Sequence, residues 1–128
     1  MIVAYLSALY LSPDFVPWIC LGLILGNRYP CFHHFRGGKG VANYLGFTLM
    51  VAPIAALASM VAWVLVYQLA RIPFVASLVM VGTLVIGTLL YIDLRLFGVS
   101  GVLLTALFVF FNHRPNIREW MHKGRAAD

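Results

Sequence analysis

Three glycines surround Lys39 in the segment Arg36-Gly37-Gly38-Lys39-Gly40, which stands directly before a long apolar run. Glycines let backbone N–H groups close around a bound anion without obstruction by side chains. If a helix follows, its first turn adds unpaired N–H groups and the positive end of the helix dipole. The segment therefore favours a phosphate site, with a flexible basic turn as the alternative. It is not a Walker A loop, because Gly40 stands where serine or threonine should follow Lys39.

A second polar cluster follows the last apolar run and contains His113, Arg114, Asn116 and Arg118. Histidine can gain or lose a proton near neutral pH, and asparagine both donates and accepts hydrogen bonds. If a helix follows Pro115, the two arginines share one face, because they are four residues apart. Such a pair suits a second phosphate or an anionic lipid headgroup. A basic anchor that holds the helix end at a membrane surface is the alternative.

Other catalytic chemistries lack their sequence signatures. None of the four histidines is followed by aspartate after four intervening residues, and no G-x-S-x-G sequence occurs. Histidine–aspartate acyl transfer and serine hydrolysis are therefore unsupported. Cys31, His33 and His34 do not have the spacing of a zinc site, and we expect neither a metal nor a cofactor. An acyl transfer would need direct attack by a positioned hydroxyl on an already activated acyl donor.

The composition places these residues in a membrane protein. The chain has 128 residues, of which 62% are apolar and 10% are charged, and its mean hydropathy is +0.93. A soluble domain is roughly half apolar and a quarter charged, and a disordered chain needs high charge. The apolar runs are continuous and do not alternate, which disfavours a transmembrane barrel. We expect an all-α, polytopic integral membrane helical bundle that forms a single domain over residues 1–128.

Five apolar runs supply the helices, and they cover residues 1–12, 16–26, 41–70, 73–92 and 99–111. The third run is too long for one upright crossing, because a helix of its 30 residues spans about 45 Å, against about 30 Å of hydrocarbon. It forms either one tilted helix that is kinked at Pro53 or two shorter helices that meet there.

The basic residues distinguish these two alternatives. Two helices place eight of the nine Lys and Arg residues on one membrane side and only Arg95 on the other, whereas one helix gives five against four. The positive-inside rule favours two helices. We therefore expect about five or six short transmembrane or half-spanning helices, with segments 27–40, 71–77 and 112–124 together on the cytoplasmic face. Asp93 and Arg95, in the opposite turn, form a local pair or act as a topological signal.

The net charge of +5 restricts the partners. The positive-inside bias, anionic membrane lipid and an anionic substrate each explain it. We expect no nucleic acid partner, because no basic stripe carries interleaved aromatic residues. A transporter usually has polar residues inside its spans, and the apolar runs of this chain have almost none.

Two motifs carry a family resemblance. Residues 25–32 read LGNRYPCF and residues 35–42 read FRGGKGVA, and residues 113–120 read HRPNIREW. The segments 25–32 and 35–42 together resemble the second signature of the bacterial acyl-phosphate:glycerol-3-phosphate acyltransferases of the PlsY type. Residues 113–120 resemble the third signature, and the order and separation also agree. The resemblance implies a multi-pass protein of the bacterial inner membrane with a site that faces the cytoplasm. It also implies transfer of a fatty acyl group from acyl phosphate to glycerol 3-phosphate, which gives lysophosphatidate and phosphate for phospholipid synthesis.

The resemblance assigns roles to individual residues. It implies that the glycine-rich segment binds substrate phosphate and that His113 and Asn116 are catalytic. Ser77 is similar to a small polar residue in the middle cytoplasmic turn of the family. The predicted phosphate-binding set is Arg36, Gly37, Gly38, Lys39, Gly40 and Ser77, and the further candidates are Asn27, Arg71, Arg114 and Arg118.

The chain also departs from the family pattern. Asn27 and Asn43 stand where the signature has histidine and threonine, and serines expected near Pro73 and Phe74 are absent. The resemblance covers only the latter two-thirds of the family, so a missing N-terminal segment is a further expected partner. Two alternatives remain open from the sequence. One is a truncated or degenerate inactive relative, and the other is a small structural or transport subunit of a membrane complex.

Overall fold

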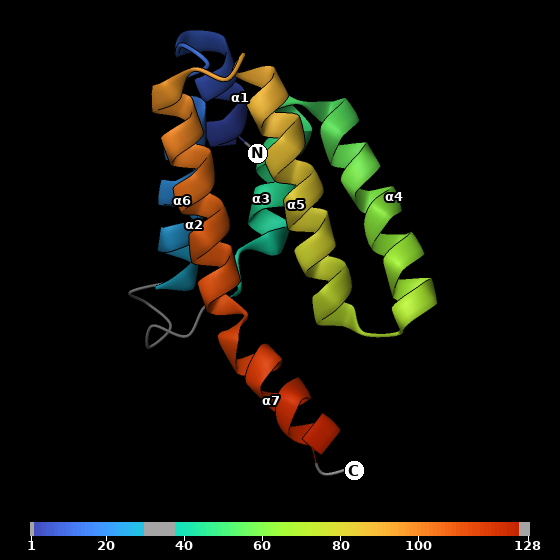
Figure 1. Cartoon of the computed structure of the whole chain (residues 1–128). Helices are drawn as coiled ribbons and strands as arrows, with labels where there is room; N and C mark the ends of the chain where they lie inside the picture. The colour runs from blue at the N-terminus through green and yellow to red at the C-terminus, as the bar shows by residue number, and fades with distance from the viewer. Residues whose placement is uncertain (1, 30–37, 126–128) are drawn as a thin grey trace.

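The computed structural model describes residues 2–29 and 38–125, and in these ranges it contains helices and no strand (Figure 1). The all-α prediction is therefore confirmed. The helices are α1 (Ile2–Tyr10), α2 (Val16–Arg28), α3 (Val41–Val51), α4 (Pro53–Ala70), α5 (Pro73–Tyr91), α6 (Leu96–Asn112) and α7 (Arg114–Arg125).

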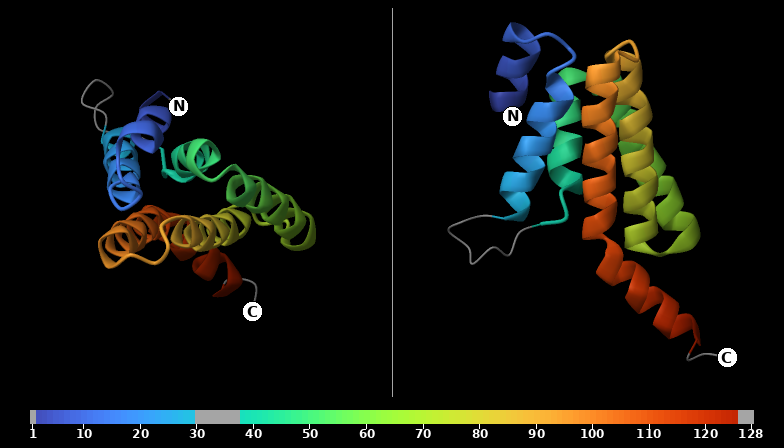
Figure 2. Two further views of the ribbon diagram at one scale, coloured as in Figure 1. Left: turned by 90° about the horizontal axis from the view of Figure 1, so that it is seen from above. Right: turned by 60° about the vertical axis from the view of Figure 1, so that its left-hand side comes forward.

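The first six helices run alternately up and down, and α7 leaves the bundle at its lower end (Figures 1 and 2). Helix α5 packs between α4 and α6, while α2 packs against α6 and α3. The end of α2, the start of α3, the α4–α5 turn and the start of α7 consequently meet at one end. This is the gathering that the charge pattern predicts for the segments beginning at residues 27, 71 and 112.

The third apolar run forms two helices, as the basic residues predict. Helix α3 ends at Val51 and α4 begins at Pro53, and between them Ala52 has φ −139° and ψ 74°, which is not helical. Proline fits the first position of a helix because it has no N–H to leave unpaired. The N–H of Ala52 still donates to the carbonyl of Thr48 at 2.7 Å, which closes the end of α3.

The lengths of the helices fit a membrane bundle that includes incomplete crossings. Helices α4 and α5 have 18 and 19 residues and are apolar enough to cross a membrane, with lengths of about 27–29 Å. Helices α6 and α7, bent by 43° relative to each other, qualify as a third span only when taken together. Helices α2 and α3 are apolar but have only 13 and 11 residues, which suits the expected half-spanning helices.

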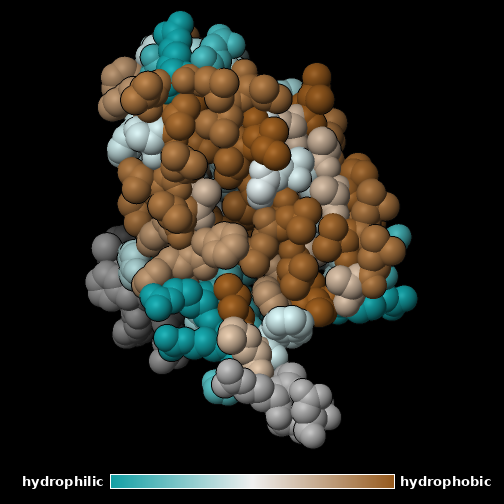
Figure 3. All heavy atoms as spheres, in the orientation of Figure 1, coloured by the Kyte–Doolittle hydropathy of each residue, from teal (hydrophilic) through white to brown (hydrophobic). Residues whose placement is uncertain are grey.

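The surface of the bundle is apolar where lipid would contact it. Only 11% of the apolar window of α4 is buried inside the bundle, and Ile54 and Leu69 are more than 80% exposed. Figure 3 shows a continuous apolar body with hydrophilic side chains at its upper and lower ends. A water-soluble helix would turn such residues inward, so the exposed faces of α4 are matched to hydrocarbon.

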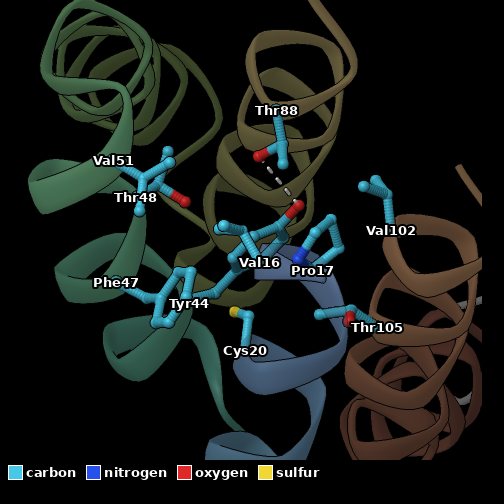
Figure 4. Close-up of a pocket in the computed structure, with 10 residues that line it drawn as sticks. All are labelled: Val16, Pro17, Cys20, Tyr44, Phe47, Thr48, Val51, Thr88, Val102 and Thr105. Atoms are coloured by element: carbon cyan, nitrogen blue, oxygen red, sulfur yellow. Dashed lines mark hydrogen bonds between the residues drawn. The ribbon is translucent and has the colours of Figure 1, made fainter. Parts of the chain in front are cut away.

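Polar side chains inside the bundle are mostly satisfied by the helices that carry them. The hydroxyls of Ser59, Thr88 and Thr105 donate to carbonyls three or four residues earlier, at 2.7–2.8 Å. Figure 4 shows a small apolar pocket between α2, α3, α5 and α6, in which the Tyr44 and Thr88 hydroxyls are 3.4 Å apart. Its volume of about 10 Å³ is close to the minimum for one water molecule, so it is a packing gap rather than a substrate site.

At the opposite end of the bundle, an ion pair joins two residues that are far apart in the sequence. The Arg95 guanidinium lies 3.3 Å from the Asp14 carboxylate, and the indole N–H of Trp18 donates to the carbonyl of Phe97 at 3.0 Å. The expected local pair of Asp93 with Arg95 is therefore wrong. The reason is that Asp93 has a left-handed φ of 51° in a tight turn, whereas the fold brings the α1–α2 turn beside Arg95.

Candidate active site

A polar hollow of about 600 Å³ lies at the lower end of the bundle. Four parts of the chain line it: the end of α2, the start of α3, the start of α5 and the junction of α6 with α7. The lining residues are Asn27, Arg28, Gly38, Lys39, Gly40, Val41, Ala42, Asn43, Pro73, Phe74, Ser77, Asn112, His113, Pro115 and Asn116.

At two positions beside the hollow, Gly38 and Gly40, the neighbouring atoms leave little room for a side chain. Gly40 precedes α3 with φ +94°, and a Cβ atom there would lie 2.5 Å from a methyl group of Ile24. A Cβ atom at Gly38 would lie 3.2 Å from the amide nitrogen of Asn27. The first turn of α3, at Val41 and Ala42, therefore opens onto the hollow, and its N–H groups have no partner within the helix. Such a helix start binds anions.

Lys39 is tied to the opposite wall through its backbone. The side-chain amide of Asn112 donates to the Lys39 carbonyl at 3.3 Å, and Asn112 is buried. This hydrogen bond fixes the glycine-rich segment against the end of α6, while the Lys39 side chain stays exposed and lines the hollow. The ammonium group adds a full positive charge beside the α3 start.

His113 lies at the bend between α6 and α7 and is only 2% exposed. Its Nδ1 is 2.8 Å from the carbonyl of Val109, and because a carbonyl only accepts, Nδ1 carries the proton. The neutral ring then has Nε2 as its acceptor. Burial lowers the pKa of His113, and the charge of Lys39 lowers it further, against the opposing effect of the Val109 hydrogen bond. The ring is therefore neutral at pH 7 and suited to accept a proton.

Ser77 lines the hollow, but its hydroxyl is already engaged. The hydroxyl donates to the carbonyl of Pro73 at 3.0 Å and accepts from the indole N–H of Trp63 at 3.3 Å. It can bind a phosphate as a donor only by leaving the Pro73 carbonyl. The remaining hydrogen-bonding capacity of Ser77 is thus small in this arrangement.

The hollow collects most of the residues that the sequence predicts. Those that line it are Asn27, Gly38, Lys39, Gly40, Ser77, His113 and Asn116. Arg71, Arg114 and Arg118 do not line it. Arg71 directly follows α4 and has a left-handed conformation. Arg114 and Arg118 line a separate hollow along α7. Arg36 and Gly37 lie outside the described residues. Among the described residues, no group of three or more His, Cys, Asp and Glu side chains could hold a metal ion.

Sequence reasoning missed two residues that line the hollow, Asn112 and Arg28. Asn112 is the last residue of α6, and the only signal for it was an amide at the end of an apolar run. Arg28 had been counted only as a topological charge, although it ends α2 beside Asn27. Both positions depend on how α2 and α6 pack, which no local pattern records.

Comparison with known proteins identifies the family. The family model described as "Glycerol-3-phosphate acyltransferase" matches residues 1–123. The chain belongs to the glycerol-3-phosphate acyltransferase family. A curated family member from Thioalkalivibrio sulfidiphilus is 36% identical over 111 residues, which cover 87% of this chain. One from Methylobacillus flagellatus is 31% identical over 124 residues, or 96% of this chain.

A solved family structure has the same fold. It is described as PlsY (YgiH), an integral membrane glycerol 3-phosphate acyltransferase in its glycerol 3-phosphate form. The TM-score is 0.83 at 25% sequence identity, and the match covers 94% of this chain and 60% of that one. The chain also covers only 54% and 63% of the two curated family members, so it spans little more than half the length of these relatives.

Proposed function

We propose that the lower hollow is the substrate site of a glycerol 3-phosphate acyltransferase that uses acyl phosphate as its donor. The observation that carries the proposal is the meeting of Lys39, the α3 start, His113 and Asn116 in one hollow. Both proposed substrates are phosphates, and the α3 start with Lys39 supplies N–H donors and charge for them. His113 and Asn116 supply an acceptor and an amide on the opposite wall.

The chemistry needs no nucleophile from the protein. The first hydroxyl oxygen of glycerol 3-phosphate attacks the carbonyl carbon of acyl phosphate, and the bond from that carbon to the phosphate oxygen breaks. Neutral His113 accepts the hydroxyl proton at Nε2 and passes it to the departing phosphate. The products are lysophosphatidate and inorganic phosphate, with atoms and charge balanced. Holding the hydroxyl close to the carbonyl lowers the barrier, because the two reactants no longer have to find each other in solution.

Stabilisation of the developing negative charge is the second contribution. In the tetrahedral intermediate the former carbonyl oxygen and the phosphate both carry negative charge. Lys39 and the N–H groups at the α3 start are fixed before the reaction, because the bond from Asn112 to the Lys39 carbonyl holds that segment. Preorganised donors of this kind are more effective than mobile water.

We place the hollow on the cytoplasmic side of a bacterial inner membrane. Arg28 and Lys39 line the hollow, and Arg71 ends α4 at the same end of the bundle, from which α7 with Arg114 and Arg118 departs. Arg95 lies in the turn at the opposite end. The positive-inside rule assigns the basic end to the cytoplasm.

The relatives are longer than this chain, and we propose that activity needs the additional segment that their length provides. We propose that in the relatives this segment precedes the part that the chain matches. The alternative function is a non-catalytic family member that keeps the fold.

A comparison of two acyl donors, an acyl phosphate and an acyl thioester, tests the proposal. The chain is co-purified with the complementary segment of a relative and given labelled glycerol 3-phosphate with either an acyl phosphate or the matching acyl thioester. We expect lysophosphatidate only with acyl phosphate, with one phosphate released per product. Equal use of the thioester would contradict the assignment of the donor.

A further inference from the structure

A second hollow of about 730 Å³ lies between the end of α2 and α7. It shares Arg28, Asn112 and Pro115 with the hollow described above, and its other lining residues lie at the end of α6 and on α7. Its lining residues are Arg28, Phe111, Asn112, Arg114, Pro115, Arg118, Glu119 and His122. Three arginines face one glutamate, so the hollow has a strong excess of positive charge.

The basic side chains of this hollow form a regular row on α7. Arg114, Arg118 and His122 are spaced four residues apart, which places them on one face of the helix. Arg114 also lies over the ring of Phe111, with its guanidinium carbon 4.8 Å from the ring centroid. Stacked arginine presents its N–H groups sideways, in the planar arrangement that matches two oxygens of a phosphate.

The surroundings of the row are apolar, as at the boundary of a membrane. Phe110 and Phe111 are 51% and 54% exposed at the end of α6, and Trp120 and Met121 are exposed on α7. The ring of Trp120 packs edge-on against Phe74, with centroids 6.3 Å apart. A helix with a basic face and an apolar face that leaves the bundle at 43° suits the plane of a membrane surface.

We propose that this second hollow binds the headgroup of an anionic phospholipid. Arg114 and Arg118, with Arg28 on the facing wall, hold the phosphate, while the acyl chains lie against Phe110 and Phe111. A free phosphate has no apolar part that could contact the exposed phenylalanines, whereas a lipid has acyl chains. The observation therefore favours a lipid over a soluble anion. The site borders the substrate hollow through Arg28, Asn112 and Pro115, but Arg114 and Arg118 belong to it alone. It does not depend on whether the chain transfers acyl groups.

Native mass spectrometry of the purified 128-residue chain tests the proposal directly. Phosphatidylglycerol and phosphatidylcholine with identical acyl chains are titrated separately, and phosphatidylglycerol is expected to bind more tightly. Each basic residue near a membrane contributes about fivefold to such binding. Arg118→Gln should therefore weaken phosphatidylglycerol binding about fivefold, and the double variant Arg114→Gln/Arg118→Gln more than about tenfold, with phosphatidylcholine binding unchanged.

The matched control is Arg71→Gln, which removes one charge at the same end of the bundle from a residue that lines neither hollow. It should leave phosphatidylglycerol binding within about twofold of the wild type, because only distant charge is lost. An equal effect of Arg71→Gln and Arg118→Gln would overturn the proposal in favour of nonspecific attraction. Displacement of the lipid by inorganic phosphate or glycerol 3-phosphate at equal concentration would overturn it in favour of a free-phosphate site.

Discussion

At the residue scale the account rests first on Lys39. The Lys39→Ala variant, made in the chain joined to the complementary segment, should reduce kcat/KM for glycerol 3-phosphate by more than about tenfold, because a charge-assisted contact contributes about 1.5–3 kcal/mol. Steady-state kinetics measures the change. Arg71→Ala, at the same end but outside the hollow, is the control and should have little effect. Unchanged kinetics in Lys39→Ala would reduce the lysine to a topological charge.

The proposed role of His113 as proton acceptor predicts a defined pH dependence of the reaction. Its pKa lies below the ordinary value of about 6.5, because burial and Lys39 disfavour the charged ring. Activity should therefore persist through pH 7 and fall only as the pH drops through that lowered pKa, when Nε2 becomes protonated. Since the unfolded chain protonates more readily, stability should also decrease below about pH 6.5. A pH–rate profile whose acid limb has its midpoint above about 6.5 would contradict this role.

The backbone conformation and the close packing at Gly40 require a glycine. Alanine there must adopt φ +94° and would place its Cβ 2.5 Å from Ile24, and the left-handed conformation alone costs about 1–2 kcal/mol. Gly40→Ala should lower the thermal unfolding midpoint in detergent by several degrees. Gly82→Ala is the control, because nothing lies within 4 Å of its added Cβ and alanine is the better helix former. Equal midpoints for the two variants would show that the turn relaxes freely.

At the element scale the break at Ala52 determines the topology. Because α3 and α4 are separate antiparallel helices, single cysteines at Lys39 and Ile72 should react with a membrane-impermeant reagent from the same side as one at Lys123. A cysteine at Arg95 should react from the other side. Labelling in intact cells and in inverted vesicles makes the comparison. Lys39 and Lys123 on opposite sides would mean that residues 41–70 cross once and that the shared hollow does not exist.

Part of the helix arrangement could be predicted from the sequence. Pro53 and the nine basic residues were enough to split the third apolar run and to bring the three polar segments to one end. The glycine-rich motif and His113 also predicted residues that line the hollow at that end. The partner of Arg95 could not be predicted, because Asp14 is 81 residues away and meets it only through packing of α2 on α6. The role of Asn112 was hidden for the same reason, since its partner is a backbone carbonyl.

At the scale of the whole molecule, the chain corresponds to only part of the proteins that it resembles. The chain reproduces the helical bundle of a solved family member at a TM-score of 0.83, yet it covers only 60% of that protein. Its hollow is lined from four parts of the chain, and Asn27 and Asn43 are among the lining residues. A misplacement of about 1 Å can cost an enzyme about 100-fold in rate. If the proposed additional segment supplies further substrate ligands, the 128 residues by themselves should be nearly inactive.

The most direct measurement is lysophosphatidate formation from acyl phosphate and labelled glycerol 3-phosphate. It is made with residues 1–128 alone and with the same chain supplied with the complementary segment of a longer relative, either fused or as a separate chain. We expect the chain alone to insert in the membrane and to show no detectable turnover. Once the segment is present, we expect turnover that depends on Lys39. Robust turnover by the 128 residues alone, or rescued turnover that Lys39→Ala does not change, would contradict the proposed function.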